Sequence, residues 1–118
     1  MSAEEIQHWF DPGDPRCKKP YGAVPSRSLV SFTLRPHRQA GFLRAFLVAR
    51  WEFQGDAVTE LPLLWSGLDR DRDLFSGVLD TGDYVGLVWY SFRLESQAGK
   101  VEFPGTFQLT VYDRAEQV

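Results

Sequence analysis

Cysteine and histidine are scarce in this chain, with one Cys and two His among its 118 residues. The lone cysteine, Cys17, cannot form an internal disulfide, and such sparse cysteine is typical of a reducing compartment. We therefore expect a cytoplasmic protein. At this length a single core can bury about 65% of the unfolded surface, so no covalent cross-link is required.

Long apolar runs and secretory signals are also missing. The longest apolar stretch, residues 42–53, is interrupted by Arg44 and Arg50 and is too short to cross a bilayer. The acidic N-terminus has no apolar segment of the kind that secretion signals carry. The sequence therefore predicts no membrane span and no membrane partner.

The chain has no excess of basic residues. Its 13 basic and 16 acidic residues give a formal net charge of −3. Domains that bind nucleic acid usually carry a basic stripe, so we expect no nucleic-acid partner. The hydrophobic content of 43% and the charged content of 25% are those of one ordinary globular domain.

Residue types that support catalysis are few and badly placed. His8 and His37 lie in proline-rich or basic segments, and no Gly-x-Ser-x-Gly motif is present. Cys17 stands between Arg16 and Lys18, which would lower its pKa, but no second cysteine accompanies it. We interpret both histidines as loop hydrogen-bonders and Cys17 as a small packed residue. The sequence therefore predicts no catalytic residue, and a stand-alone enzyme is a remote alternative.

Three aspartates alternate along residues 69–73 with the spacing that opens a calcium-binding loop. Leu74 stands where such a loop needs glycine, and the two intervening arginines offset the carboxylate charges. We therefore expect a solvated turn with local ion pairs, and neither a metal nor another cofactor.

Two-residue alternation dominates the rest of the sequence. Residues 86–95 place Val88, Tyr90, Phe92 and Leu94 on one face, which predicts a central β-strand. Turn residues separate this segment from other alternating segments. These further strand candidates are residues 29–35, 42–53, 60–66, 74–80, 101–103 and 107–112, with 67–73 as a charged loop. The pattern predicts an all-β fold, an immunoglobulin-like antiparallel β-sandwich of about seven to eight strands.

A proline-rich segment precedes the first strand. Residues 8–25 contain four prolines and two glycines, which exclude a helix or a central strand. The segment also carries Trp9, Phe10 and Tyr21, and a free linker seldom keeps three aromatic residues. We therefore expect three parts: a packed, extended lead-in over residues 1–27, the sandwich over 28–113, and over 114–118 the start of a linker to a catalytic domain that this sequence lacks.

Aromatic side chains are the best candidates for a binding surface. Trp89 alternates out of phase with the core face of its strand, and Trp65 and Tyr84 flank loops. An exposed indole can lie against a sugar ring, and burying about 100 Å² in this way stabilises the contact by about 2.5 kcal/mol before ordering costs. The alternative is that Trp89 packs under another domain, because exposed apolar patches mark interfaces as readily as ligand sites.

Four segments together carry a family resemblance. They are the lead-in, with His8, Asp14-Pro15 and residues 18–24 (KKPYGAV), followed by 30–35 (VSFTLR), 86–92 (GLVWYSF) and 107–113 (FQLTVYD). In this order they resemble the N-terminal β-sandwich of bacterial α-amylase-family (family 13) glycoside hydrolases of the neopullulanase, cyclomaltodextrinase and amylopullulanase kind. Two features depart from the pattern: Cys17 replaces an expected aromatic residue, and residues 100–106 are shorter than the usual loop.

In those enzymes the sandwich precedes a catalytic (β/α)8 barrel that contains the catalytic acids. The resemblance therefore implies a non-catalytic accessory domain of a starch-degrading or α-glucan-degrading hydrolase, with that barrel as a partner. One form is a weak carbohydrate-binding module for α-glucan, using Trp89, Trp65 and Tyr84. The other is a structural docking or dimerisation domain that binds no sugar. Convergence of Trp89 and Trp65 in one groove would favour the first, and their separation the second.

Overall fold

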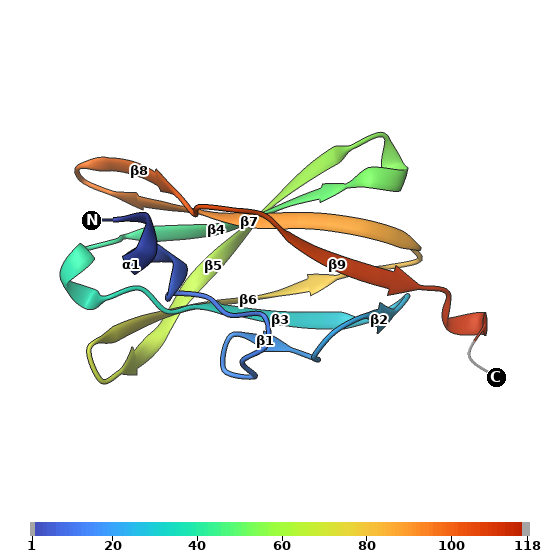
Figure 1. Cartoon of the computed structure of the whole chain (residues 1–118), viewed down its shortest axis with the longest axis horizontal. Coiled ribbons are helices and arrows are strands. Elements are labelled where there is room, and N and C mark those ends of the chain that lie inside the picture. Colours follow the sequence, from blue (N-terminus) through green and yellow to red (C-terminus); the bar gives the residue numbers. More distant parts are fainter. Residues whose placement is uncertain (1, 117–118) are drawn as a thin grey trace.

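The computed structural model describes residues 2–116 and consists mostly of β-strands (Figure 1). A single α-helix, α1 (Ala3–Gln7), begins the chain. The strands are β1 (Lys18–Lys19), β2 (Val24–Pro25), β3 (Leu29–Leu34), β4 (Arg44–Trp51), β5 (Ala57–Asp69), β6 (Arg72–Asp80), β7 (Gly86–Ser96), β8 (Gly99–Glu102) and β9 (Phe107–Tyr112). Short 3-10 turns are η1 (Arg38–Ala40), η2 (Glu52–Gln54) and η3 (Arg114–Glu116). The predicted all-β fold is confirmed.

The strands form one curled sheet in the order β1-β3-β6-β5-β4-β7-β9-β2, with β8 paired to β7. The long strand β5 joins two layers, because its first half pairs with β4 and its second half with β6. The β2–β9 pairing is parallel, so the sheet is mixed. Nine strands occur in residues 2–116, beyond the expected seven to eight. The additional β1 and β2 are two-residue strands in the lead-in, too short to leave a period in the sequence.

The central strand β7 confirms the alternation seen in the sequence. Its side chains are alternately buried and half-buried, with Val88, Tyr90, Phe92 and Leu94 in the core. Neighbouring β4 buries Ala45, Leu47, Ala49 and Trp51 against them. The strand predicted over 42–53 is shorter at both ends, and the flanking Leu43 and Phe53 are exposed. On the outer face of β4, Phe46 and Val48 are half-buried, so that face is only partly covered.

The prediction of a loop over residues 67–73 is wrong. β5 continues to Asp69 and β6 begins at Arg72, which leaves Arg70 and Asp71 as the turn. Residues 69–73 at the end of this hairpin are all charged, which hides the strand period there. A register shift between Trp65 and Gly67 also interrupts the alternation. Pro62 lies just before β5 changes partner from β4 to β6.

The lead-in is part of the domain. Trp9, Phe10 and Cys17 are buried in the main core, whereas Tyr21 is 80% exposed. β1 pairs with β3 and β2 pairs with β9, at opposite ends of the sheet order. Consecutive pieces of the lead-in therefore cover both edges of the curled sheet and hold the two layers together (Figure 1).

Helix α1 was not expected from the sequence. Its N-cap is Ser2, whose hydroxyl accepts a hydrogen bond from the backbone N–H of Glu5, and acidic residues occupy its first turn. Only Ile6 of this helix is buried. Among residues 2–116, no helix has the length and apolar character needed to cross a membrane.

At the other end, Arg114 donates hydrogen bonds to Ser26, which ties η3 to the end of the lead-in. Residues 117 and 118 of the predicted linker lie outside the described part of the chain.

Candidate functional site

Trp89 lies on the outer face of β7, out of the main core as its phase in the sequence predicted. It is half-buried, and the guanidinium carbon of Arg50 lies 5.9 Å from the indole centroid. The indole N–H donates to Glu52 Oε1 at 3.2 Å. Arg50 and Glu52 therefore already engage the ring and the polar atom that a sugar would need.

Trp65 is the more open of the two indoles, with 55% of its surface exposed. Its N–H donates to Asp73 Oδ1 at 2.9 Å. The ring borders a hollow of about 270 Å³ that Phe42, Leu43 and Arg38 also line. Trp65 thus offers an exposed ring face at a small depression, whereas the Phe42 ring beside it is buried.

Tyr84, the third residue predicted for a sugar-binding surface, is buried in the core with 6% of its surface exposed. Its hydroxyl donates to the Leu87 carbonyl at 2.6 Å and accepts from the Phe53 N–H at 2.9 Å. The ring packs edge-on against Trp51 with centroids 4.9 Å apart. The hydroxyl and the ring of Tyr84 together hold the β6–β7 turn against the β4–β5 hairpin.

The strand register places Trp89 and Trp65, the two tryptophans predicted to bind sugar, far apart. Trp89 stands opposite Arg50 on β4, whereas Trp65 lies beyond Leu63, the residue opposite Ala45. Arg50 and Ala45 are themselves about 17 Å apart along an extended strand. In addition, Trp65 pairs with Phe75 of β6, after β5 has left β4. The structure therefore does not bring Trp89, Trp65 and Tyr84 into one groove.

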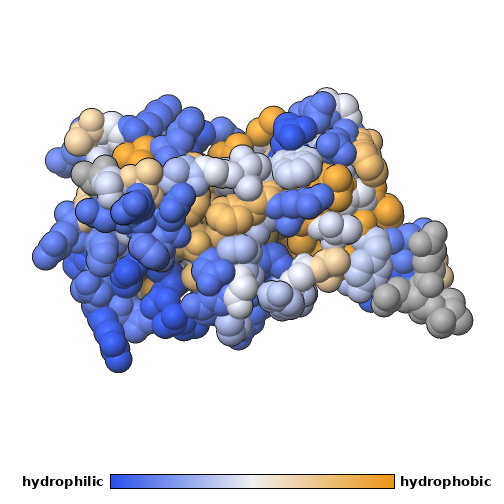
Figure 2. Space-filling view, viewed as in Figure 1, coloured by the Kyte–Doolittle hydropathy of each residue, from blue (hydrophilic) through white to orange (hydrophobic). Residues whose placement is uncertain are grey.

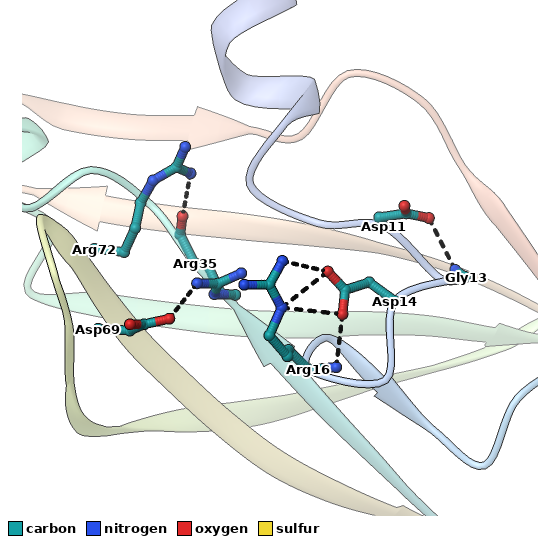
Figure 3. Close-up of polar contacts among 7 residues, drawn as sticks. All are labelled: Asp11, Gly13, Asp14, Arg16, Arg35, Asp69 and Arg72. Atoms are coloured by element: carbon teal, nitrogen blue, oxygen red, sulfur yellow. Dashed lines mark hydrogen bonds and ion pairs between the residues drawn. The ribbon is translucent and has the colours of Figure 1, made fainter.

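A hollow of about 990 Å³ lies elsewhere, between the lead-in and the β5–β6 turn. Its lining is dominated by arginine and aspartate (Figure 3). Asp14 accepts hydrogen bonds from the Arg16 side chain, the shortest at 2.8 Å, and from the Arg16 backbone N–H at 2.9 Å. Arg35 pairs with Asp69, and Arg72 donates to the Arg35 carbonyl at 2.9 Å. We call this the polar cleft.

Charge is balanced in the polar cleft. Its lining contains four arginines and four aspartates, and two of the arginines already pair with two of the aspartates. The Arg16 side chain, followed by its backbone N–H, holds the pKa of the Asp14 carboxyl below its ordinary value. Such a site can hydrogen-bond a polar ligand or a partner surface, but its guanidinium groups do not act as general bases at neutral pH.

Cys17 lines the same cleft but is not an activated thiol. Burial raises its pKa, contrary to the lowering expected from its basic neighbours in the sequence. The ammonium of Lys18 instead donates to the carbonyls of Pro20 and Gly22, and Arg16 pairs with Asp14.

The aspartates of residues 69–73 point to separate partners. Asp69 pairs with Arg35, Asp71 lies 3.2 Å from the ring Nδ1 of His37, and Asp73 pairs with Arg38. Within residues 2–116, no group of three or more histidine, cysteine or carboxylate side chains is arranged to hold a metal ion.

The Asp14–Arg16 pair predicts a pH dependence. A depressed carboxyl pKa stabilises the fold above the unfolded-state pKa, near 3.9, and this contribution disappears as the pH falls through the folded-state pKa. We expect Asp14→Asn to lower the free energy of unfolding at pH 7 by at most about 1 kcal/mol, because Arg16 is largely exposed. Urea denaturation at several pH values should show the difference from the wild type shrinking in acid.

Carboxyl NMR of an Arg16→Gln variant provides the control for this assignment. The Asp14 pKa should move up toward its ordinary value when the donor is removed. An Asp14 titration that is identical in both proteins would contradict the assignment.

No protein-family model matches this chain, and no curated protein matches it either. Among solved structures, the chain is similar to an engineered protein determined by crystallography, with a TM-score of 0.50 and 13% sequence identity. The similarity covers 79% of this chain and 18% of the engineered protein, so the chain spans less than a fifth of that protein's length. At this identity the similarity shows the fold alone.

Sequence reasoning missed the residues that line the polar cleft. Arg35 and Asp69 are far apart in the sequence and meet only because β5 extends through the segment predicted to be a loop. Asp14 and Arg16 did carry a local signal, since an Asp-Pro-x segment favours a turn in which the aspartate accepts a nearby backbone N–H.

Proposed function

We propose that this chain is a non-catalytic accessory domain of a cytoplasmic starch-degrading or α-glucan-degrading hydrolase, and that it acts by packing against the catalytic (β/α)8 barrel. The support from the sequence is the resemblance carried by residues 18–24, 30–35, 86–92 and 107–113. The all-β fold is compatible with the sandwich that this resemblance implies.

The observation that carries the docking role is an exposed apolar end of the molecule. Figure 2 shows hydrophobic surface gathered at the end with the β4–β5 hairpin and the start of β7, and hydrophilic surface at the opposite end. Phe53 of η2, Val58 near the start of β5 and Val85 just before β7 belong to these elements, and their exposed fractions are 64%, 60% and 44%. We call these three side chains the apolar end. Exposed apolar side chains gathered in this way are typical of a docking surface.

Within the apolar end, Phe53 is anchored to the rest of the fold. The Phe53 N–H donates to the buried Tyr84 hydroxyl, and the Phe53 ring lies directly against the backbone of Gly86. Val85 immediately precedes Gly86. A preorganised surface loses little conformational entropy on binding, which favours a stable domain contact.

Weak glucan binding is the second candidate function, and one observation favours it. The Trp65 ring is more than half exposed and borders its own hollow of about 270 Å³. One such platform supports about millimolar affinity. Trp89 adds little to it, because Arg50 and Glu52 occupy that ring.

The docking role predicts a complex that forms in trans. We expect this chain to bind a neopullulanase-type barrel from which the barrel's own N-terminal domain has been removed, as measured by sedimentation velocity. Phe53→Ser combined with Val85→Ser should weaken the complex at least about tenfold, the effect of losing about 1.4 kcal/mol. Leu64→Ser is the matched control, because Leu64 is 71% exposed but lies on the half of β5 that pairs with β6.

Two results would contradict the docking role. One is the absence of a complex, and the other is an equal loss of affinity in the Leu64→Ser control. A titration with maltoheptaose, followed by the indole N–H signals in NMR, then decides the second candidate. Saturable shifts of the Trp65 indole would support glucan binding, and flat spectra would exclude it.

A further inference from the structure

A small hollow of about 290 Å³ lies between the lead-in and β9. Its lining includes Lys18, Tyr21, Tyr90, Gln108 and Thr110. The lysine is on β1 and Tyr90 is on β7, so residues from both layers of the curled sheet line it. We call it the seam hollow.

Lys18 is a buried ammonium without a carboxylate partner. Lys18 is only 4% exposed, and its Nζ donates hydrogen bonds to the Pro20 and Gly22 carbonyls at 2.7 and 3.1 Å. No aspartate or glutamate in residues 2–116 forms an ion pair with it. An ammonium has three N–H groups, so one donor and the positive charge stay uncompensated. Desolvation accordingly lowers the Lys18 pKa.

Tyr90 also lines this hollow and carries a buried hydroxyl without a partner. The residue is 1% exposed, and its hydroxyl has no hydrogen-bond partner among the described residues. Burial raises its pKa, so the hydroxyl keeps its proton at neutral pH. Leaving such a group unpaired is unfavourable by about 1–3 kcal/mol.

We propose that the seam hollow binds a small oxyanion, such as a phosphate or carboxylate group, whose oxygens accept hydrogen bonds from Lys18 and Tyr90. The Lys18 ammonium can only donate, and the protonated Tyr90 hydroxyl can donate beside it, so a ligand with acceptor oxygens complements both groups. The uncompensated positive charge selects an anion over a neutral hydroxyl group. The polar cleft does not select an anion in this way, because its arginines and aspartates are equal in number.

The surroundings leave space for the organic part of such a ligand. The exposed ring of Tyr21 and the exposed side chains of Gln108 and Thr110 also line the hollow. An aromatic face with polar side chains around it suits a compact polar body such as a sugar ring. This site goes beyond the docking role and does not depend on it, since the apolar end involves other residues.

The test is an NMR titration of the full 118-residue chain with inorganic phosphate and, separately, with glucose 6-phosphate, at constant ionic strength. We expect saturable shifts of the Ala23, Gln108 and Thr110 amides with both probes, and tighter binding if the sugar body contributes. Glucose alone should leave these signals in place. Tighter glucose 6-phosphate binding identifies an esterified sugar as the source, and equal affinities identify free phosphate.

Three variants tie the shifts to the proposed groups. Lys18→Met should weaken phosphate binding at least about tenfold, and Tyr90→Phe should weaken it about threefold to tenfold. Lys19→Met is the matched control, because Lys19 is the exposed neighbour on the same strand and should leave binding unchanged. If Lys18→Met does not fold, Tyr90→Phe decides the question, since it removes only the hydroxyl.

The proposal is overturned by unperturbed amides across the phosphate titration, which would mean that no oxyanion binds beside Lys18 and Tyr90. Equal weakening by Lys19→Met, or the same shifts with glucose as with glucose 6-phosphate, would also overturn it. None of these results bears on the barrel complex, so failure here is distinguishable from failure of the docking role.

Discussion

With Phe10 replaced by alanine, the free energy of unfolding should fall by about 3–5 kcal/mol. Phe10 is 2% exposed although it lies in the proline-rich lead-in. Its ring centroid is 4.6 Å from that of Phe92 and 5.1 Å from that of Phe107, on two strands of one layer. It also stacks near Phe32 of the other layer, at 6.3 Å. The truncation therefore leaves a cavity where both layers meet.

Backbone pairing on either side of Phe10 limits how far this cavity can collapse. The Arg35 N–H donates to the Trp9 carbonyl at 2.8 Å, and the Thr33 N–H donates to the Cys17 carbonyl at 2.7 Å. The lead-in is therefore fixed to β3 and its end, and cannot shift to refill the space. Poor collapse places a substitution at the costly end of the range for large-to-small changes.

Urea denaturation followed by tryptophan fluorescence measures the effect. Tyr21→Ala is the control, since Tyr21 belongs to the same lead-in but is 80% exposed, and its loss should change stability by less than about 0.5 kcal/mol. If the free energy of unfolding of Phe10→Ala lies within about 1 kcal/mol of the wild-type value, the lead-in is dispensable to the core.

Strands with one face in the core were predictable from the sequence. Residues 107–112 form β9 with the predicted bounds, and residues 86–95 form β7 with one residue added. Both have a clean two-residue alternation because one face packs on the core and the other does not. The β5–β6 hairpin was not predictable in this way. The second half of β5 has no buried side chain on either face, so no period survives there.

The candidate sites depended on contacts that no local pattern encodes. Trp89 lies outside the main core as its phase predicts, but the Arg50 that covers it comes from β4, through the strand register. Tyr84 occupies a turn, where exposure is the usual expectation, yet it is buried against Trp51. Lys18 is a type of residue that is rarely buried. Its burial follows from the carbonyls of Pro20 and Gly22, which accept its hydrogen bonds.

Replacing Gly86 by alanine should lower the free energy of unfolding by about 3 kcal/mol, through two separable effects. Gly86 has φ +141°, a region that residues with a Cβ rarely adopt, and this strain accounts for about 1–3 kcal/mol. A Cβ at this position would also lie 2.2 Å from Phe53 Cδ2 and 2.9 Å from Phe53 Cγ. Relieving that overlap requires Phe53 to move, at a further cost of about 1–3 kcal/mol.

Gly99→Ala separates the two effects, because Gly99 has a similar φ of +133° but nothing within 4 Å of its added Cβ. The Gly99→Ala variant should therefore lose only the stability that the backbone strain accounts for. When Phe53 is already alanine, the loss in free energy of unfolding caused by Gly86→Ala should fall to the loss caused by Gly99→Ala. Urea denaturation measures both losses. An undiminished effect in that background would show that Phe53 does not pack on Gly86. The same result would remove the physical reason for treating Phe53 as a rigid part of the apolar end, since its ring would then be free to leave that surface.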